Sequence, residues 1–222
     1  TAPNFEAPSD SDANNVYDIT VTASDGSLTA TQAVAITVTN LNDNAPVFTS
    51  GGTGTVAENA ATSTVIYTAA TTDADNLAAR TYTVSGTDAG LVDITSAGVV
   101  TLKASADYES KTGYSFNVIA NDGANNTTQA VVVSVTNVNE APVITSAATA
   151  SFAENGTGTV YTATATDVDA GTTLTYTLGG TDAAKFAINS GTGVVTFVTA
   201  PNYEAPTDSG ANNIYDITVT AT

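Results

Sequence analysis

Carboxylate and carboxamide side chains are concentrated in two short segments of this sequence. Residues 40–44 read Asn-Leu-Asn-Asp-Asn and residues 137–140 read Asn-Val-Asn-Glu, and Ala-Pro closes each segment. Each segment follows a run of apolar and β-branched residues, and a hydrophobic pair comes directly after the proline. Oxygen ligands of this kind are those that Ca²⁺ prefers. The two segments therefore predict joints between modules, held by a hard cation.

Four further acidic motifs recur along the chain. Ala-Glu-Asn occurs twice, and Asp-x-Asp occurs twice just after the second predicted strand of a repeat. A triplet of Asp or Asn, an aromatic residue and Glu occurs three times, and an aspartate twice ends a strand-like run. Their acidic members are Glu58 and Glu154, Asp73 and Asp75, Asp167 and Asp169, Glu6, Asp107 with Glu109, Glu204, and Asp25 and Asp122. Taken singly, each motif has a structural explanation, because Asp and Asn side chains cap turns. The recurrence of all four motifs together needs a further explanation.

The chain repeats itself at intervals of just under 100 residues. Residues 1–24 and 199–222 are identical at 19 of 24 positions, and Ala57-Glu58-Asn59 recurs 96 residues later. This repeat length is typical of a β-sandwich domain. We therefore expect residues 1–43 to be the C-terminal part of one repeat, residues 44–140 a complete repeat, and residues 141–222 a repeat that lacks its last strand.

Hydrophobic alternation predicts strands throughout. Tyr17, Ile19 and Val21 alternate with polar residues, and the same pattern recurs after Tyr114 and after Tyr215. In the complete repeat we expect strands near residues 47–49, 54–57, 63–70, 80–85, 91–94, 98–103, 113–121 and 127–138. About seven short antiparallel strands per repeat predict an all-β fold of tandem Ig-like Greek-key β-sandwiches in an elongated array.

Composition narrows the function classes. The chain has 4 basic and 22 acidic residues, a net charge of −18, which argues against binding to nucleic acid or to anionic membrane surfaces. This charge is compatible with bound multivalent cations and equally with a highly soluble surface. No run of 18 apolar residues predicts a membrane span. The sequence contains no His and no Cys, and its carboxylate pairs recur once per repeat, so we expect no enzyme activity.

Taken together, the motifs resemble those of the cadherin repeat in order and spacing. The resemblance rests on Ala-Glu-Asn, Asp-x-Asp, Asp-Tyr-Glu, Ala-Asn-Asp-Gly and Asn-x-Asn-Asp-Asn-Ala-Pro, and it covers all 222 residues. The Asn-Glu-Ala-Pro variant and the Thr- and Ala-rich body are more similar to bacterial cadherin-like surface arrays than to animal cadherins. The resemblance implies an extracellular or cell-surface protein with up to three Ca²⁺ ions in each joint between repeats.

The resemblance also implies a ligand set for each joint. The first joint would use Glu6, Asn40, Asn42, Asp43, Asn44, Asp73, Asp75 and Asp122. The second would use Glu58, Asp107, Glu109, Asn137, Asn139, Glu140, Asp167 and Asp169. Asp25, Glu154 and Glu204 occupy the same motif positions and complete the candidate metal ligands.

The ligand sets depart from the family pattern in both joints. Asn40 and Asn137 stand where the family linker starts with Asp, and Asn4 replaces the Asp of the Asp-x-Glu motif. The second linker is one residue shorter and carries Glu140 for Asp. We therefore expect that a joint can bind fewer than three ions, and that this applies more to the first joint than to the second.

Two functions follow as hypotheses. The first is an extracellular, calcium-rigidified structural or adhesive array, such as a surface adhesin or a filament component. Its partners would be neighbouring repeats of the same or an identical chain, including a strand donated by a neighbour, or a cell-surface or glycan ligand. The alternative is a carbohydrate- or ligand-binding accessory module of a secreted protein, which would require a cluster of exposed aromatic side chains.

Overall fold

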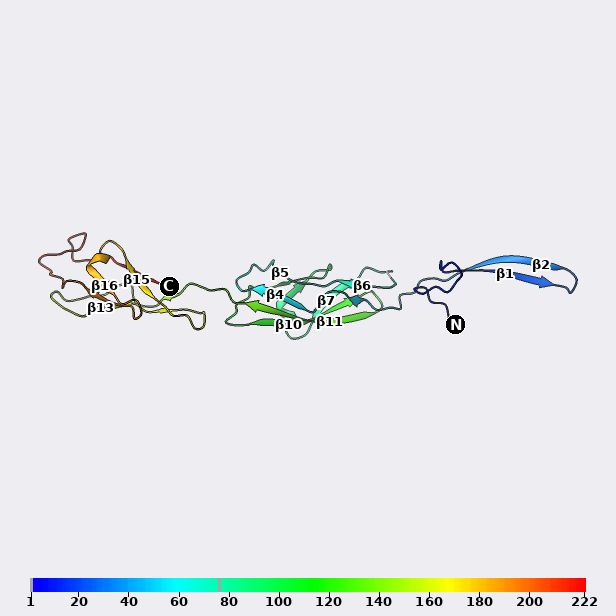
Figure 1. Ribbon diagram of the computed structural model, residues 1–222, viewed down its shortest axis with the longest axis horizontal. Helices are drawn as coiled ribbons and strands as arrows, with labels where there is room; N and C mark the ends of the chain where they lie inside the picture. The colour runs from blue at the N-terminus through cyan, green and yellow to red at the C-terminus, as the bar shows by residue number, and fades with distance from the viewer. Residues whose placement is uncertain (1, 76) are drawn as a thin grey trace. The chain divides into compact units, whose positions relative to one another are not determined.

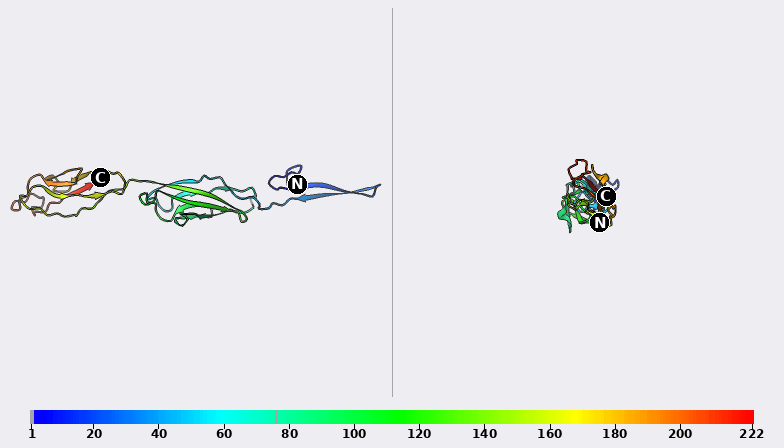
Figure 2. Two further views of the ribbon diagram at one scale, coloured as in Figure 1. Left: turned by 90° about the horizontal axis from the view of Figure 1, so that it is seen from below. Right: turned by 90° about the vertical axis from the view of Figure 1, so that its left-hand side faces the viewer.

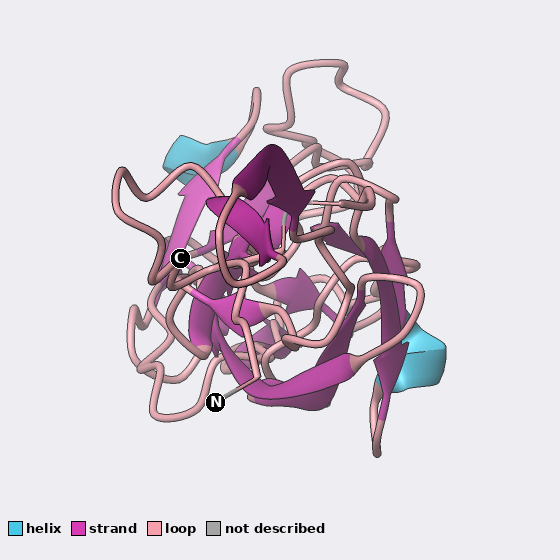
Figure 3. Ribbon diagram, turned by 90° about the vertical axis from the view of Figure 1, so that its right-hand side faces the viewer, coloured by secondary structure: helices cyan, strands magenta, loops and turns pink. Residues whose placement is uncertain are grey.

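The computed structural model describes residues 2–75 and 77–222, which form two compact units, Thr1–Asn137 and Val138–Thr222. Strands and loops make up nearly all of the described chain, and its helical elements are the short 3-10 turns η1 (Ala89–Leu91) and η2 (Ala183–Lys185) (Figure 3). The predicted all-β fold is confirmed. The predicted domain limits 1–43, 44–140 and 141–222 stay a prediction.

The first unit begins with a long β-hairpin. Strand β1 (Val16–Ser24) pairs with β2 (Thr29–Thr37) in antiparallel register, from Val16 opposite Thr37 to Ser24 opposite Thr29 (Figure 2). The two strands form a sheet of their own among the described residues. At the turn, the Asp25 carboxylate accepts the backbone N–H groups of Ser27 at 2.9 Å and Leu28 at 2.7 Å. Asp25 therefore caps the hairpin turn.

A complete β-sandwich follows the hairpin in the first unit (Figure 1). One sheet has the order β4 (Thr53–Ala57), β11 (Asn126–Thr136), β10 (Gly113–Asn121) and β7 (Thr81–Ser85), with β4 parallel to β11. The facing strands are β5 (Val65–Thr68), β9 (Val99–Leu102) and β8 (Val92–Ile94), beside the short pair of β3 (Val47–Phe48) and β6 (Thr71–Thr72).

Strand alternation builds the core of this sandwich. On β10, Phe116 is 2% exposed and Val118 is fully buried, while on β11 Val131 and Val133 are fully buried. The residues between them face outward, as the period of two in a pleated strand requires. The other large core side chains are Val56, Ile66, Tyr67, Val92, Val100, Leu102, Tyr114 and Val135.

The second unit repeats most of this sandwich. It contains β12 (Val143–Ile144), β13 (Thr159–Thr162), β14 (Ala165–Thr166), β15 (Tyr176–Gly179), β16 (Phe186–Ile188), β17 (Val194–Phe197) and β18 (Thr218–Ala221). The sheet β13-β17-β16 has the order of β5-β9-β8, and β15-β18 pair as β7 and β10 do. Residues 149–153, which match β4 in sequence position, form no strand in the described structure.

The strand predictions are confirmed for every strand of the complete repeat except β6, whose two residues are too few to show a pattern. The stretch predicted at 63–70 is shorter in the structure, because β5 ends at Thr68 and the chain then turns to β6. No helix among the described residues is long and apolar enough to cross a membrane.

Two neighbouring valines on β11 test which face of this strand lies in the hydrophobic core. We expect Val131→Ala to lower the free energy of unfolding by about 2 kcal/mol, because it removes buried methyl groups and leaves a cavity. Val132→Ala, on the adjacent residue that is 53% exposed, removes the same groups from the solvent face and should cost less than about 0.5 kcal/mol. Urea unfolding of the two variants measures both values, and equal losses would contradict the assignment.

Candidate metal centre

A linker of residues 38–46 connects β2 to β3 and carries the first oxygen-rich segment. At its start, the Val38 backbone N–H donates to the Asn15 carbonyl at 2.8 Å, next to the end of the hairpin. At its end, Pro46 is among the fully buried side chains. The linker is therefore held at both ends, and its polar side chains occupy defined positions.

Asn44 binds both carboxylate oxygens of Asp75. Its backbone N–H donates to Asp75 Oδ2 at 2.7 Å, and its side-chain Nδ2 donates to Asp75 Oδ1 at 2.7 Å. Asn40 Nδ2 adds a bond to the Asp75 carbonyl at 2.8 Å. Asp75 in turn donates its backbone N–H to Asp73 Oδ1 at 3.0 Å, the local turn that an Asp-x-Asp pair favours. The linker and the Asp-x-Asp motif are thus joined directly.

A second contact joins the linker to the turn between β10 and β11. Asn42 Nδ2 donates to the Asp122 carbonyl at 3.2 Å, and Asn125 Nδ2 donates to the Asn44 carbonyl at 3.2 Å. The Asp122 carboxylate accepts the backbone N–H groups of Ala124 at 2.8 Å and Asn125 at 2.6 Å. Asp122 therefore shapes the turn from which Asn125 reaches the linker.

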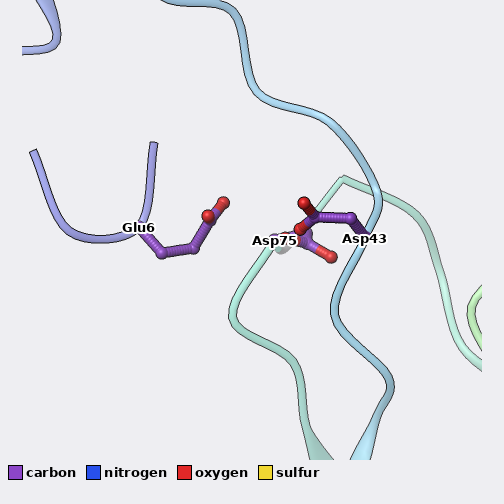
Figure 4. A group of neighbouring side chains, drawn as sticks. All are labelled: Glu6, Asp43 and Asp75. Atoms are coloured by element: carbon purple, nitrogen blue, oxygen red, sulfur yellow. The ribbon is translucent and has the colours of Figure 1, made fainter. Parts of the chain in front are cut away.

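Glu6 approaches the linker from the loop before β1. Asn4 Oδ1 accepts the Glu6 backbone N–H at 2.9 Å, and Asn15 Nδ2 donates to the Phe5 carbonyl at 3.0 Å, so the loop is tied to the start of the hairpin. Carboxylate oxygens of Glu6, Asp43 and Asp75 lie within 4.8 Å of one another. Figure 4 shows the Glu6 side chain directed toward the other two carboxylates.

Three buried oxygens in this region accept no hydrogen bond. They are Asn40 Oδ1, Asp73 Oδ2 and Asp122 Oδ2, and the side chains of Asp75 and Asp122 are only 3% and 2% exposed. Buried polar atoms in proteins are almost always paired, so unpaired acceptors call for a donor or a cation. The ligand atoms are oxygens only, and the chain contains no His or Cys. This donor set fits Ca²⁺ rather than Zn²⁺.

The surroundings keep Asp75 and Asp122 ionised. Burial alone would raise the pKa of Asp75, but the side-chain and backbone N–H donors of Asn44 outweigh it and hold that pKa below its ordinary value. The backbone N–H of Asn125 lowers the pKa of Asp122 in the same way, against the effect of burial. Both residues are therefore carboxylates at neutral pH, which is the form that binds a cation.

The first unit also positions four of the ligands predicted for the second joint. Glu58 is 3% exposed and accepts the Tyr108 backbone N–H at 2.8 Å. Glu109 accepts a bond from Asn137 Nδ2 at 3.2 Å. Asp107 accepts the hydroxyl and the backbone N–H of Ser110, at 2.8 and 3.0 Å, and these bonds lower its pKa.

The second unit repeats the geometry around Asp75. The Glu140 backbone N–H donates to Asp169 Oδ2 at 2.7 Å, as that of Asn44 does to Asp75. The Asp169 backbone N–H donates to Asp167 Oδ1 at 2.9 Å, and Asn139 Nδ2 binds the Glu140 carbonyl at 3.0 Å. The second linker thus contacts its own Asp-x-Asp motif in the same manner.

Three predicted ligands lie outside these arrangements. Asp25 caps the hairpin turn, and Glu154 accepts the Tyr203 backbone N–H at 3.0 Å, as Glu58 does from Tyr108. Glu204 is the last residue of the Asn202-Tyr203-Glu204 triplet and is exposed. Its backbone N–H donates to Asn202 Oδ1. Their role as metal ligands stays a prediction, as does that of the other predicted ligands.

Sequence reasoning missed Asn125, because an Asn in a turn has no distinctive spacing and the matching residue of the first hairpin is Leu28.

Comparisons with known proteins identify related sequences. No family model matches the chain. It is 36% identical over 188 residues to the human cadherin EGF LAG seven-pass G-type receptor 2, covering 80% of this chain and 6% of the receptor. It is 31% identical over 237 residues to the Drosophila melanogaster protocadherin-like wing polarity protein stan, covering 96% of this chain and 6% of that protein. The chain therefore spans only a small part of either relative.

Solved structures share the fold. The crystal structure of mouse cadherin-23 EC22-24 superposes with a TM-score of 0.58 at 27% identity, covering 97% of this chain and 71% of that one. The structure of PcdhgB3 EC1-4 gives a TM-score of 0.69 at 24% identity, covering 97% of this chain and 55% of that one, and it supports the fold alone. The β-sandwiches described above are thus Ig-like domains of the kind these structures contain.

The bonds from Asn125 to the linker can be tested without metal. In chelator, we expect Asn125→Ala to speed amide hydrogen exchange in residues 40–46 several-fold, because the carbonyl of Asn44 loses its side-chain donor. Asn126→Ala is the matched control, since the side chain of Asn126 bonds to Asn121 within the β10–β11 hairpin. Exchange measured by mass spectrometry should be unchanged by the control substitution. Equal effects of both substitutions would show that Asn125 does not hold the linker.

Proposed function

We propose that this chain, which is built of cadherin repeats, is part of an extracellular adhesive or structural array whose joints are rigidified by Ca²⁺. The observation that carries the proposal is the convergence of Glu6, Asp43 and Asp75 at one linker. These carboxylates come from the loop before β1, from the linker, and from the sandwich that follows it. Similarity to cadherins and protocadherins over 80% or more of the chain supports the same conclusion.

The residues of the first linker fit a bound calcium ion. Glu6, Asp43 and Asp75 would supply charged ligands, and the unpaired oxygens of Asn40, Asp73 and Asp122 add further acceptors. Like charges held this close repel one another and favour separation of the elements that carry them. Bound Ca²⁺ supplies positive charge that reverses this repulsion. The hydrogen bonds from Asn44 to Asp75 keep the ligands in place before the ion binds.

The second ligand set is proposed from the sequence and from the local geometry within each unit. Glu58, Asp107, Glu109 and Asn137 belong to the first unit, and Asn139, Glu140, Asp167 and Asp169 belong to the second. The bond from Glu140 to Asp169 matches that from Asn44 to Asp75, which supports the same use. The proposal includes up to three Ca²⁺ ions in each joint. It also includes the departures from the family pattern at Asn40 and Asn137, which stand where the family linker starts with Asp.

The cellular role is proposed at the level of the family. Relatives named as cadherins and protocadherins support a place outside the cell and a role in adhesion, with neighbouring repeats or cadherin chains as partners. They do not support an enzyme. The resemblance to bacterial arrays rests on the Asn-Glu-Ala-Pro variant and on composition, and the comparisons support neither it nor a filament role, because the similar proteins named above with their organism come from human, mouse and fruit fly. A glycan ligand has no support beyond the sequence-based alternative.

Calcium-dependent melting tests the metal site. With free Ca²⁺ at about 100 times its dissociation constant, we expect the melting temperature of the wild type to rise by about 5–10 °C over that in chelator. Extracellular calcium modules typically have dissociation constants of about 10⁻⁴–10⁻³ M, which sets the concentration range. Asp73→Asn combined with Asp75→Asn should reduce this rise to the part that the second ligand set contributes, and should change the melting temperature in chelator much less.

A charge-matched control separates ligation from net charge. Asp18→Asn combined with Asp93→Asn removes two carboxylates from exposed strand positions outside the linker. This control should keep the full calcium-dependent rise. The proposal is wrong if the Asp73 and Asp75 substitutions lower the melting temperature equally in calcium and in chelator.

A further inference from the structure

A short turn at residues 107–111 carries two of the calcium ligands predicted for the second joint, Asp107 and Glu109. The Asp107 carboxylate accepts the backbone N–H of Ser110 at 3.0 Å and its hydroxyl at 2.8 Å. The Lys111 backbone N–H donates to the Asp107 carbonyl at 2.9 Å and closes the turn. These five residues therefore form one locally hydrogen-bonded segment.

The start of this turn is held by the segment that follows β4. The Tyr108 backbone N–H donates to Glu58 Oε2 at 2.8 Å, and the Asn59 backbone N–H donates to the Ala106 carbonyl at 2.9 Å. Glu58 is itself a predicted ligand and is 3% exposed. A shift of the turn would therefore move a hydrogen-bond donor of the Glu58 carboxylate, so the turn affects a third ligand besides the two that it carries.

The end of the turn is held by the buried Asp88. Lys111 Nζ lies 3.0 Å from Asp88 Oδ1, and the two side chains are 39% and 9% exposed. Asp88 Oδ2 accepts the Ser115 backbone N–H at 2.7 Å, and the Asp88 backbone N–H donates to the Ser115 carbonyl at 3.1 Å. The Lys111 ammonium also lies 5.4 Å from the centre of the Tyr114 ring, within the range of a cation–π contact. Asp88 thus links the turn to β10.

The charge of Asp88 makes this link depend on the lysine. The Ser115 backbone N–H, with the Lys111 ammonium beside it, holds the pKa of Asp88 below its ordinary value against the effect of burial. Asp88 is therefore a carboxylate at neutral pH. A buried carboxylate that loses its cation keeps the cost of its desolvation, which favours rearrangement of the groups around it. Removal of the lysine would thus release the end of the turn.

The second unit contains an equivalent buried aspartate with a different partner. Asp182 is 4% exposed and accepts the Asp216 backbone N–H at 2.8 Å, in the way that Asp88 accepts a backbone N–H of β10. Its other carboxylate oxygen accepts the Ser209 backbone N–H at 2.7 Å, where Asp88 has the ammonium of Lys111. A neutral backbone donor therefore replaces the lysine in this unit.

Loop length accounts for the difference between the units. Between the glutamate of the acidic triplet and the tyrosine of the next apolar run, the second unit has the ten residues 205–214 and the complete repeat has the four residues 110–113. The longer loop supplies its own backbone N–H to the buried carboxylate, whereas the shorter loop reaches it with a lysine side chain. In both units, a buried aspartate thus ties the segment after the triplet to the residues that follow it.

We propose that the ion pair of Asp88 and Lys111 positions the predicted calcium ligands of the second joint that the first unit holds. These ligands are Glu58, Asp107 and Glu109. The inference rests on the proposed calcium function. Lys111 acts through the turn and is not itself a ligand, because an ammonium group has no acceptor for a cation. Its charge is balanced by Asp88, so it opposes the bound ion little.

A site-resolved calcium titration tests this role. In NMR spectra of the ¹⁵N-labelled 222-residue chain, the amides of Tyr108 and Glu109 report on the second ligand set, and those of Asn44 and Asp75 on the first. We expect Lys111→Met to raise the calcium concentration at half-maximal shift by about fivefold at the second set. The value at the first set should stay unchanged, because the first linker contacts the turn after β10, whereas the substituted residue lies before this strand.

Two further variants serve as controls. Lys111→Arg keeps a cation within reach of Asp88 and should retain most of the wild-type affinity at the second set. Lys103→Met removes the same charge from the chain, but it breaks a pair with Asp93 at 3.7 Å whose side chains are 47% and 69% exposed. Exposed pairs of this kind contribute little, so this variant should leave both ligand sets unchanged.

The possible results separate this inference from the proposed function. A wild type that binds calcium at the second set with the same affinity as Lys111→Met would overturn the inference alone. Equal losses at both ligand sets, or an equal loss in Lys111→Arg, would also overturn it, because the effect would then not be local to the ion pair. A wild type whose amides do not respond to calcium would overturn the proposed function, and this inference with it.

Discussion

The geometry of the first linker depends on the hydrogen bonds through which Asn44 holds Asp75. Two donors from one linker residue fix both oxygens of a buried carboxylate, at 2.7 Å each. This contact places Asp75 beside Asp43 and Glu6, and it orders the Asp73 turn behind it. It therefore brings like charges together, which costs free energy unless a cation is present. The linker is held by hydrogen bonds, and the carboxylates of Glu6, Asp43 and Asp75 together carry the negative charge that a bound cation would balance.

The β-sandwich supplies rigid supports for this linker. The hydrophobic core between its sheets fixes β10 and β11, and the turn between these strands positions Asp122 and Asn125. A similar hairpin, β1–β2, lies before the linker. The apolar face of β10 and β11 is buried against the facing strands, whereas Ile19, Val21 and Ile36 of the first hairpin are about half exposed.

The sequence alone predicts the strands well, because alternation of apolar residues directly reflects which face of a strand is buried. It also predicts Asp73, Asp75 and Asp122 as a group, since these residues recur at fixed spacing. It does not predict Asn125, because that contact depends on how a turn approaches the linker in space. It does not predict that Asn40, Asp73 and Asp122 each keep an unpaired buried oxygen, because pairing is a property of three-dimensional packing. β6 was missed because two residues carry too little periodicity.

The proposed function requires that the side chains at the first linker bind calcium directly. Anomalous X-ray scattering from crystals of the 222-residue chain grown with calcium tests this claim most directly. The account predicts an anomalous peak within 2.3–2.6 Å of carboxylate oxygens of Glu6 and Asp75. It also predicts that the oxygens of Asn40, Asp73 or Asp122 that lack hydrogen bonds are turned toward bound ions. Ordered carboxylates at this linker with no anomalous peak between them would contradict the account.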